Sequence, residues 1–293
     1  MDLVFQVLQI VAPVFFLALI GFFWVRTGWS YDVEFVTRLS MTVSIPCLIF
    51  MALTRSEVDP LVLRDTVVAA IVAYLAVGVV MWALVKLIGL DMPTFWAPLT
   101  FGNTGNIGLP IALFAFGQAG FDVAVVVFAV MAIFSFTFGV WVVSGGGSPV
   151  AAFREPLVWG TVLGSLFLAM GWQVPAWAGA SLDLVGQMAI PLMLVTLGVA
   201  IFRLQPRSLG RATWLCLLKY AICVAIPLFV GEYFGLPPVA LAVLVLQVAT
   251  PVAVTSYMLA TKYKARADDV AGLVVVSTLM SVAAIPALLA YFI

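Results

Sequence analysis

The sequence predicts an all-α integral membrane protein with ten transmembrane helices. Three observations support this class: 65% of the 293 residues are hydrophobic, only 9% are charged, and the mean hydropathy is +1.23. A soluble domain of this size would carry charge on about a quarter of its residues. The thirteen basic and thirteen acidic side chains also cancel, which argues against a nucleic-acid partner.

Apolar runs of about 20 residues, enough to cross a bilayer, occur ten times along the chain. The links between them are short and rich in Gly, Pro or charged residues, so we expect no separate soluble domain. The first run lacks a basic stretch before it and continues to about Val25, unlike a signal peptide. The expected spans are 3–25, 34–53, 65–88, 93–117, 121–143, 154–171, 181–202, 209–233, 237–261 and 269–292.

Basic residues orient this predicted bundle. Only Arg55 and Arg64 lie at one side, and the span ends at the other side hold Arg26, Arg38, Lys86, Arg154, Arg203, Arg207, Arg211, Lys262, Lys264 and Arg266. The positive-inside rule makes the richer side cytoplasmic. We therefore expect a multi-pass protein of the cytoplasmic (inner) cell membrane, with both termini outside and the 144–153 linker inside.

The second half of the chain repeats landmarks of the first half at nearly constant spacing. The matching pairs, 143 to 147 residues apart, are Pro13 and Pro156, Pro46 and Pro191, Pro93 and Pro238, and Asp122 and Asp269. Each half holds five spans, an odd number, so the second half would be inverted. This predicts two inverted five-helix repeats, 1–143 and 154–293, joined by 144–153. Many secondary transporters have this plan, with a substrate site at the midplane.

Two spans contain residues that favour broken helices. The fourth holds three glycines, two asparagines, a threonine and a proline within 101–110, and the ninth holds Gln247 to Pro251. Interrupted backbone is tolerated in a membrane only against protein or a wet cavity, and half-helix N-termini attract anions. The alternative, that Gly and Pro only pack or kink these helices, stays open. The candidate ligand residues are Asn103, Thr104, Gly105, Asn106, Gln247 and Thr250, and the candidate break residues are Gly108, Pro110 and Pro251.

Lys219 is the one charge predicted near the middle of a span, and the chain has no His. Ionisable residues at that depth are usually functional, and a lone deep cation suits a negatively charged substrate. The alternative is that Lys219 extends to an interface or pairs with backbone carbonyls. The lack of deep acids argues against an embedded enzyme, so we expect no catalytic residue, metal site or cofactor.

These motifs resemble those of the auxin efflux carrier family. The resemblance covers the whole chain, and its most specific parts are Asn103-Thr104-x-x-x-Gly108-x-Pro110, Gln247-x-Ala249-x-Pro251 and Leu259-Ala260-x-x-Tyr263. It implies a sodium/bile-acid-symporter-like, or NhaA-like, architecture with broken crossover helices 4 and 9. Spans 1, 2, 6 and 7 would form a dimerising scaffold, and spans 3–5 and 8–10 a mobile transport domain of elevator type. In plant relatives, the asparagine that matches Asn103 lines the carboxylate site.

The chain departs from the plant PIN-type carriers in three places. The long cytoplasmic loop is absent, as in bacterial-type members. Ser256 replaces a proline of the ninth-span motif, which puts the bend of that helix in doubt. Tyr74 lies near the position where plant members carry a third-span carboxylate, so carboxylate-based proton coupling is in doubt.

The resulting expectation is a secondary active or facilitative transporter of a small organic anion by alternating access. Malonate, another dicarboxylate or an auxin-like acid would be the substrate, and the lipid bilayer and a second copy of the chain the partners. Uniport, proton symport and Na⁺ coupling stay open, as do the substrate and the direction of transport. The alternative function is an anion-binding membrane sensor or channel on the same fold.

Overall fold

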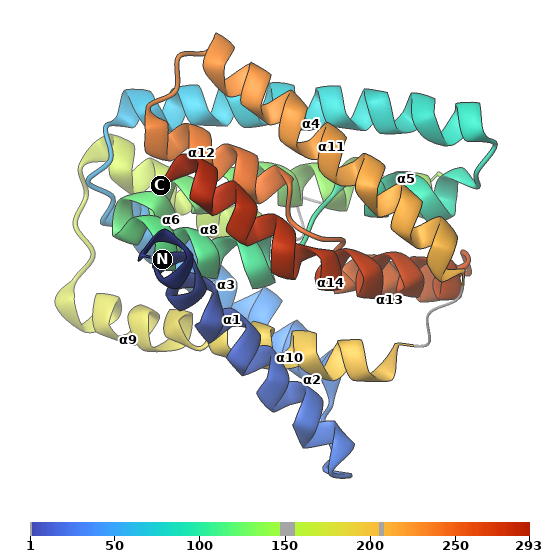
Figure 1. The fold of residues 1–293 in the computed structure, drawn as a ribbon. Coiled ribbons are helices and arrows are strands. Elements are labelled where there is room, and N and C mark those ends of the chain that lie inside the picture. Colours follow the sequence, from blue (N-terminus) through green and yellow to red (C-terminus); the bar gives the residue numbers. More distant parts are fainter. Residues whose placement is uncertain (1, 147–155, 205–207) are drawn as a thin grey trace.

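The computed structural model describes residues 2–146, 156–204 and 208–293, and its regular elements there are all helices (Figure 1). Most of the predicted linker 144–153, together with Arg154 and Arg207, lies outside the described residues. The α-helices are α1 Asp2–Arg26, α2 Val33–Leu39, α3 Ile45–Thr54, α4 Pro60–Ile88, α5 Met92–Thr100, α6 Leu109–Phe134, α7 Val140–Ser144, α8 Pro156–Met170, α9 Ala176–Gln187, α10 Ala189–Arg203, α11 Leu209–Tyr233, α12 Pro238–Val248, α13 Val254–Lys262 and α14 Ala267–Phe292. Three π-helical turns interrupt them: η1 Ser40–Ser44, η2 Thr104–Gly108 and η3 Ser135–Gly139.

Within the described residues, seven helices are long and apolar enough to cross a membrane. They cover 7–26, 33–54, 60–88, 104–144, 176–203, 209–233 and 267–292, and α8 and α12 are shorter apolar helices. The longest of the seven bends at Gly117, whose φ of 63° and ψ of −155° are not helical. The sequence prediction of an all-α, multi-pass membrane protein is therefore confirmed, whereas the count of ten spans stays a prediction.

Small residues bring two pairs of helices into close contact. On α10, a Cβ added to Gly198 would lie 1.7 Å from the carbonyl oxygen of Ala18 on α1. On α8, a Cβ on Gly160 would lie 2.7 Å from the carbonyl oxygen of Pro46 on α3. Such contacts let membrane helices pack backbone to backbone. In Figure 1, α1, α2, α9 and α10 lie on one side of the molecule, and α4 and α11 on the opposite side.

Two helices between these sides stop inside the protein. α5 ends at Thr100 and α12 ends at Val248, and after each of them the chain is extended for a few residues before a new helix begins. The two extended segments pair in an antiparallel bridge between Gly102 and Val252, and the backbone N–H of Asn103 donates to the carbonyl of Pro251 at 2.7 Å. This pairing satisfies backbone groups that the broken helices leave free.

The second extended segment has a further partner on α14. The backbone N–H of Val252 donates to Oγ of Ser277 at 2.9 Å, and the carbonyl of Ser277 accepts from the Tyr220 hydroxyl of α11 at 2.9 Å. All three side chains are at least nine-tenths buried. These hydrogen bonds therefore connect the crossing of the two extended segments to both α11 and α14.

Candidate functional site

A small cavity lies where the two interrupted helices meet, with a volume of about 50 Å³. One water needs roughly 10–15 Å³ by this measure, so the cavity has room for about three to five. Its lining comes from four separate stretches of sequence. These residues are Met41, Phe101, Gly102, Asn103, Gly105, Asn106, Phe128, Met131, Ala132, Ser135, Phe136, Ala253, Val254, Thr255 and Ser256.

Two helix N-termini open onto this cavity. One is the start of η2 at Thr104, which continues into α6, and the other is the start of α13 at Val254; neither has a side-chain cap. The N–H groups of a first helical turn have no partner within the helix and carry partial positive charge. Because Gly105 and Thr255 lie in these first turns and line the cavity, the arrangement is suited to an anion.

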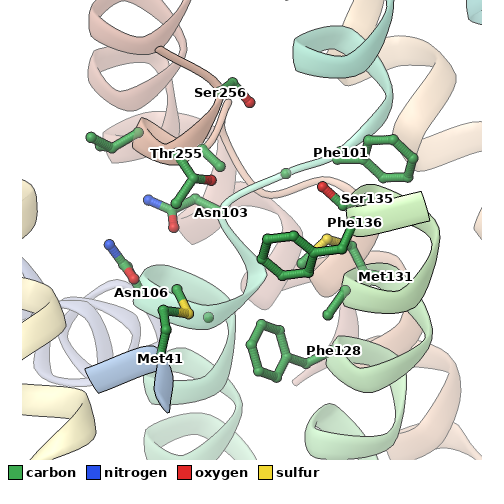
Figure 2. Close-up of a pocket in the computed structure, with 15 residues that line it drawn as sticks. Met41, Phe101, Asn103, Asn106, Phe128, Met131, Ser135, Phe136, Thr255 and Ser256 are labelled. Atoms are coloured by element: carbon green, nitrogen blue, oxygen red, sulfur yellow. The ribbon is translucent and has the colours of Figure 1, made fainter. Parts of the chain in front are cut away.

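The carboxamides of Asn103 and Asn106 add directed donors. Figure 2 shows Asn103 beside Thr255 and Asn106 beside Met41, with the rings of Phe128 and Phe136 across from them. Asn103 is 5% exposed, and its Nδ2 has no hydrogen-bond partner in the described part of the chain. A buried donor without a partner costs about 1–3 kcal/mol. A ligand that presents an oxygen atom here would recover that energy.

Three of the predicted ligand residues, Thr104, Gln247 and Thr250, do not line the cavity, and two of them, Gln247 and Thr250, make contacts at the crossing. Thr104 is fully buried, and Gln247 donates from Nε2 to the carbonyl of Ala124 at 3.4 Å. The Thr250 hydroxyl donates to the carbonyl of Gln247 at 2.7 Å, within its own chain segment. Gln247 packs against Gly108, and Thr250 packs against Gly102, both on the other interrupted segment. Their position favours a structural contribution to the site.

The predicted break residues lie at different points of the two interruptions. Pro251 is part of the second extended segment, whereas Gly108 ends η2 and Pro110 lies in the first turn of α6. The helix therefore begins before Pro110 and passes through it. Proline lacks an N–H and its ring collides with the carbonyl four residues earlier. Here that carbonyl belongs to Asn106, which lies in η2, and the wider π turn carries it away from the proline ring. The π turn η1 stands in the same position ahead of Pro46.

Lys219 lies outside the cavity lining, at the end of α5. It is fully buried, and its Nζ is 3.4 Å from the carbonyl oxygen of Leu99 and 3.7 Å from Sγ of Cys223. In an unbroken helix the N–H of Asn103 would bond to that carbonyl, but here it donates to Pro251. Among the described residues no carboxylate pairs with Lys219. The ammonium thus caps the negative end of a half-helix.

Tyr74 of α4 is also fully buried, and its hydroxyl has no hydrogen-bond partner among the described residues. Its ring stacks on Phe101, with the centroids 6.3 Å apart. Tyr74 therefore lies next to the first extended segment, near the cap that Lys219 provides.

Sequence reasoning missed several lining residues. Thr255 and Ser256 lie four and five residues after Pro251, so their place in the first turn of a half-helix was a usable signal. Met41, Phe128 and Phe136 come from other stretches of sequence, and nothing in their local pattern marks them. Only the tertiary packing brings them to the cavity.

Comparison with known proteins adds an independent observation. Residues 141–289, just over half of the chain, match the family model described as membrane transport protein. This is the auxin efflux carrier family, and its members are transporters and not enzymes. Among curated proteins no sequence matches the chain.

Proposed function

The chain belongs to the membrane transport protein family, that of the auxin efflux carriers, and from this we propose that it carries a small organic anion across the cytoplasmic membrane. The observation that carries the proposal is the meeting of two uncapped helix N-termini at one cavity. Their free N–H groups and the unpartnered Nδ2 of Asn103 would bind a carboxylate. Asn106, Thr255 and Ser256 would supply further donors.

The arrangement of helices supports an inverted repeat. Each half of the chain contains one interrupted helix, and α1 packs on α10 as α3 packs on α8. The bend at Gly117 divides 104–144 into two helices, and the shorter α8 and the α12–α13 pair add two further crossings. We propose ten spans on this basis. The scaffold would comprise spans 1, 2, 6 and 7, and the transport domain spans 3–5 and 8–10.

The proposed mechanism is alternating access of elevator type. A cavity of about 50 Å³ is far below the roughly 300–1,000 Å³ of ordinary small-molecule sites, so a bound acid requires the surrounding helices to separate. Both ends of the chain lie toward the same side of the molecule in Figure 1, which supports placing both termini on one side of the membrane, and the distribution of basic residues would make that side the outer one. We propose a homodimer through the scaffold. Uniport, H⁺ coupling and Na⁺ coupling are compatible with a site built from amides and backbone.

Transport by purified protein in proteoliposomes tests this function. Labelled malonate and indole-3-acetate serve as anions and glycerol as the neutral control. We expect saturable uptake of an anion, and counterflow against a preloaded unlabelled anion, which a channel or sensor does not produce. Replacing external Na⁺ by K⁺, and separately imposing a pH gradient, identifies the coupling ion.

Asn103→Ala tests the site. Hydrogen bonds to charged groups contribute about 1.5–3 kcal/mol, so we expect uptake to fall about ten- to a hundredfold. Gln187→Ala removes an exposed carboxamide on α9 and should leave uptake unchanged. Wild-type rates in Asn103→Ala would reject the site, and absence of anion flux in the unmodified protein would reject the function.

A further inference from the structure

A larger groove lies beside the cavity. It has a volume of about 650 Å³ and runs between α2–η1 and α13. Met41 and Thr255 line the groove, the cavity and a third small void of about 20 Å³. Phe136 also borders both the groove and the cavity. One layer of side chains therefore separates the groove from Asn103 and Asn106.

The groove is more positive than negative. Arg38 comes from the last turn of α2 and Lys262 from the last turn of α13, and Glu34 is the one acid that lines the groove. Both cations are exposed, and neither pairs with a carboxylate among the described residues. An excess of one sign of charge in a cleft raises the local concentration of counter-ions. This groove would therefore gather anions.

The separating layer has features of a movable barrier. Met41 belongs to the π turn η1, in which the hydroxyls of Ser40 and Ser44 are buried without a partner in the described chain. π turns are frequent at functional sites, and the unbranched methionine side chain adapts readily to new packing. Met41 is half-buried and borders both the cavity and the groove, so a change of its rotamer requires no helix to unfold.

We infer that the groove between α2 and α13 is the entrance by which small anions reach the cavity, with Arg38 and Lys262 as its attracting charges and Met41, Thr255 and Phe136 as its gate. The identity of the anion as a transported carboxylate rests on the proposed function. The route, its charge and its gate rest on the groove and cavity alone, so they are tested without a substrate.

Thiol modification measures access along this route. The background chain carries Cys47→Ser and keeps the two fully buried cysteines, Cys216 and Cys223. Single cysteines are then placed at Thr42, which lines only the groove, and at Ser135, which lines only the cavity. The probes are the anionic sulfonatoethyl and the cationic trimethylammonioethyl methanethiosulfonates, and the labelling rate is followed by mass spectrometry in lipid nanodiscs.

The anionic probe should modify Thr42→Cys at least about threefold faster than the cationic probe, because the groove attracts anions. Arg38→Gln with Lys262→Gln should abolish this preference. Arg64→Gln with Lys86→Gln, which removes two cations that do not line the groove, should leave it unchanged. Equal rates for the two probes at Thr42→Cys would overturn the attracting charge.

Ser135→Cys should react at least about tenfold more slowly than Thr42→Cys, and Met41→Ala should remove most of that difference because a flexible side chain that fills the gap is shortened. Met188→Ala, which shortens an exposed methionine elsewhere, is the control. Equal labelling of both positions with Met41 intact would overturn the gate. If labelling follows these expectations while proteoliposomes take up no carboxylate, the entrance stands and the proposed function fails.

Discussion

The two interrupted helices meet at one crossing, yet their free ends are stabilised in different ways. Where α5 stops, the carbonyl of Leu99 accepts from Lys219, a residue of α11 that is distant in sequence. Where α12 stops, the carbonyl of Gln247 accepts from the hydroxyl of Thr250, only three residues further along the same chain. One end thus depends on tertiary structure and a buried charge, and the other on a local turn.

The beginnings of the two following half-helices also differ. The first presents carboxamides, Asn103 and Asn106, whereas the second presents the hydroxyls of Thr255 and Ser256. Amide groups donate more strongly directed hydrogen bonds, and the Nδ2 of Asn103 has no partner among the described residues. The side chains of the first interruption therefore supply most of the specificity that we propose for anion binding. The second interruption supplies mainly backbone N–H groups and the position of a helix N-terminus.

The largest expected effect concerns Gly102, where the two interruptions approach each other backbone to backbone. A Cβ on Gly102 would lie 2.1 Å from Thr250 Oγ1 and 2.8 Å from the Thr250 carbonyl oxygen. Gly102→Ala should therefore cost at least about 3 kcal/mol, the upper part of the range for overpacking, and sharply lower the yield of folded protein. Thr250→Ala should not restore stability, because the backbone oxygen remains. Thermal unfolding of the detergent-solubilised single and double variants measures both effects.

Gly108 supplies the matched control for that experiment. A Cβ there would lie 2.1 Å from Oε1 and 2.8 Å from Cδ of Gln247, which are side-chain atoms. Gly108→Ala should destabilise the protein less than Gly102→Ala, and Gln247→Ala should rescue it. Rescue of Gly102→Ala by Thr250→Ala, or failure of Gln247→Ala to rescue Gly108→Ala, would contradict the packing at the crossing.

Removal of the Lys219 ammonium, which caps the end of α5 from α11, has the next largest expected effect. Lys219→Met keeps the length of the side chain but leaves the negative end of α5, the helix that leads into the cavity-lining segment, without its compensating charge. We expect uptake to fall at least about tenfold, equivalent to about 1.4 kcal/mol, at nearly unchanged thermal stability, because relief of a buried charge offsets the lost contact. Cys223→Ala removes the second contact of Lys219 and should change uptake little. Wild-type uptake by Lys219→Met would show that the ammonium has only a packing function.

The sequence was sufficient for the all-helical membrane class and for the two segments in which helices are interrupted. Glycine, asparagine and proline signal such segments through intrinsic propensity, and apolar length signals the class. Lys219 is fully buried, whereas its depth in the membrane stays a prediction. A backbone carbonyl was one of the expected alternatives for its partner, but the choice of Leu99 could not be predicted, because that carbonyl is free only once Asn103 has bonded to Pro251. Phe128, Phe136 and Met41 carry no local signal. Their place at the cavity depends on long-range packing between helices.

The smallest expected effect concerns the hydroxyl of Thr250, which caps the end of α12 within its own chain segment. It decides whether Thr250 is a structural residue or an anion ligand. If its hydroxyl only closes the turn at the end of α12, Thr250→Val should lower the stability by about 1 kcal/mol, an ordinary hydrogen bond, and leave uptake within about twofold. Ser277→Ala should cost more, about 1–3 kcal/mol, because it leaves the buried N–H of Val252 without its partner. Thermal unfolding and uptake of the same preparations give both quantities. A loss of uptake in Thr250→Val at unchanged stability would make Thr250 an anion ligand, as its sequence position predicts, and would require the second interruption to open further toward the cavity during transport.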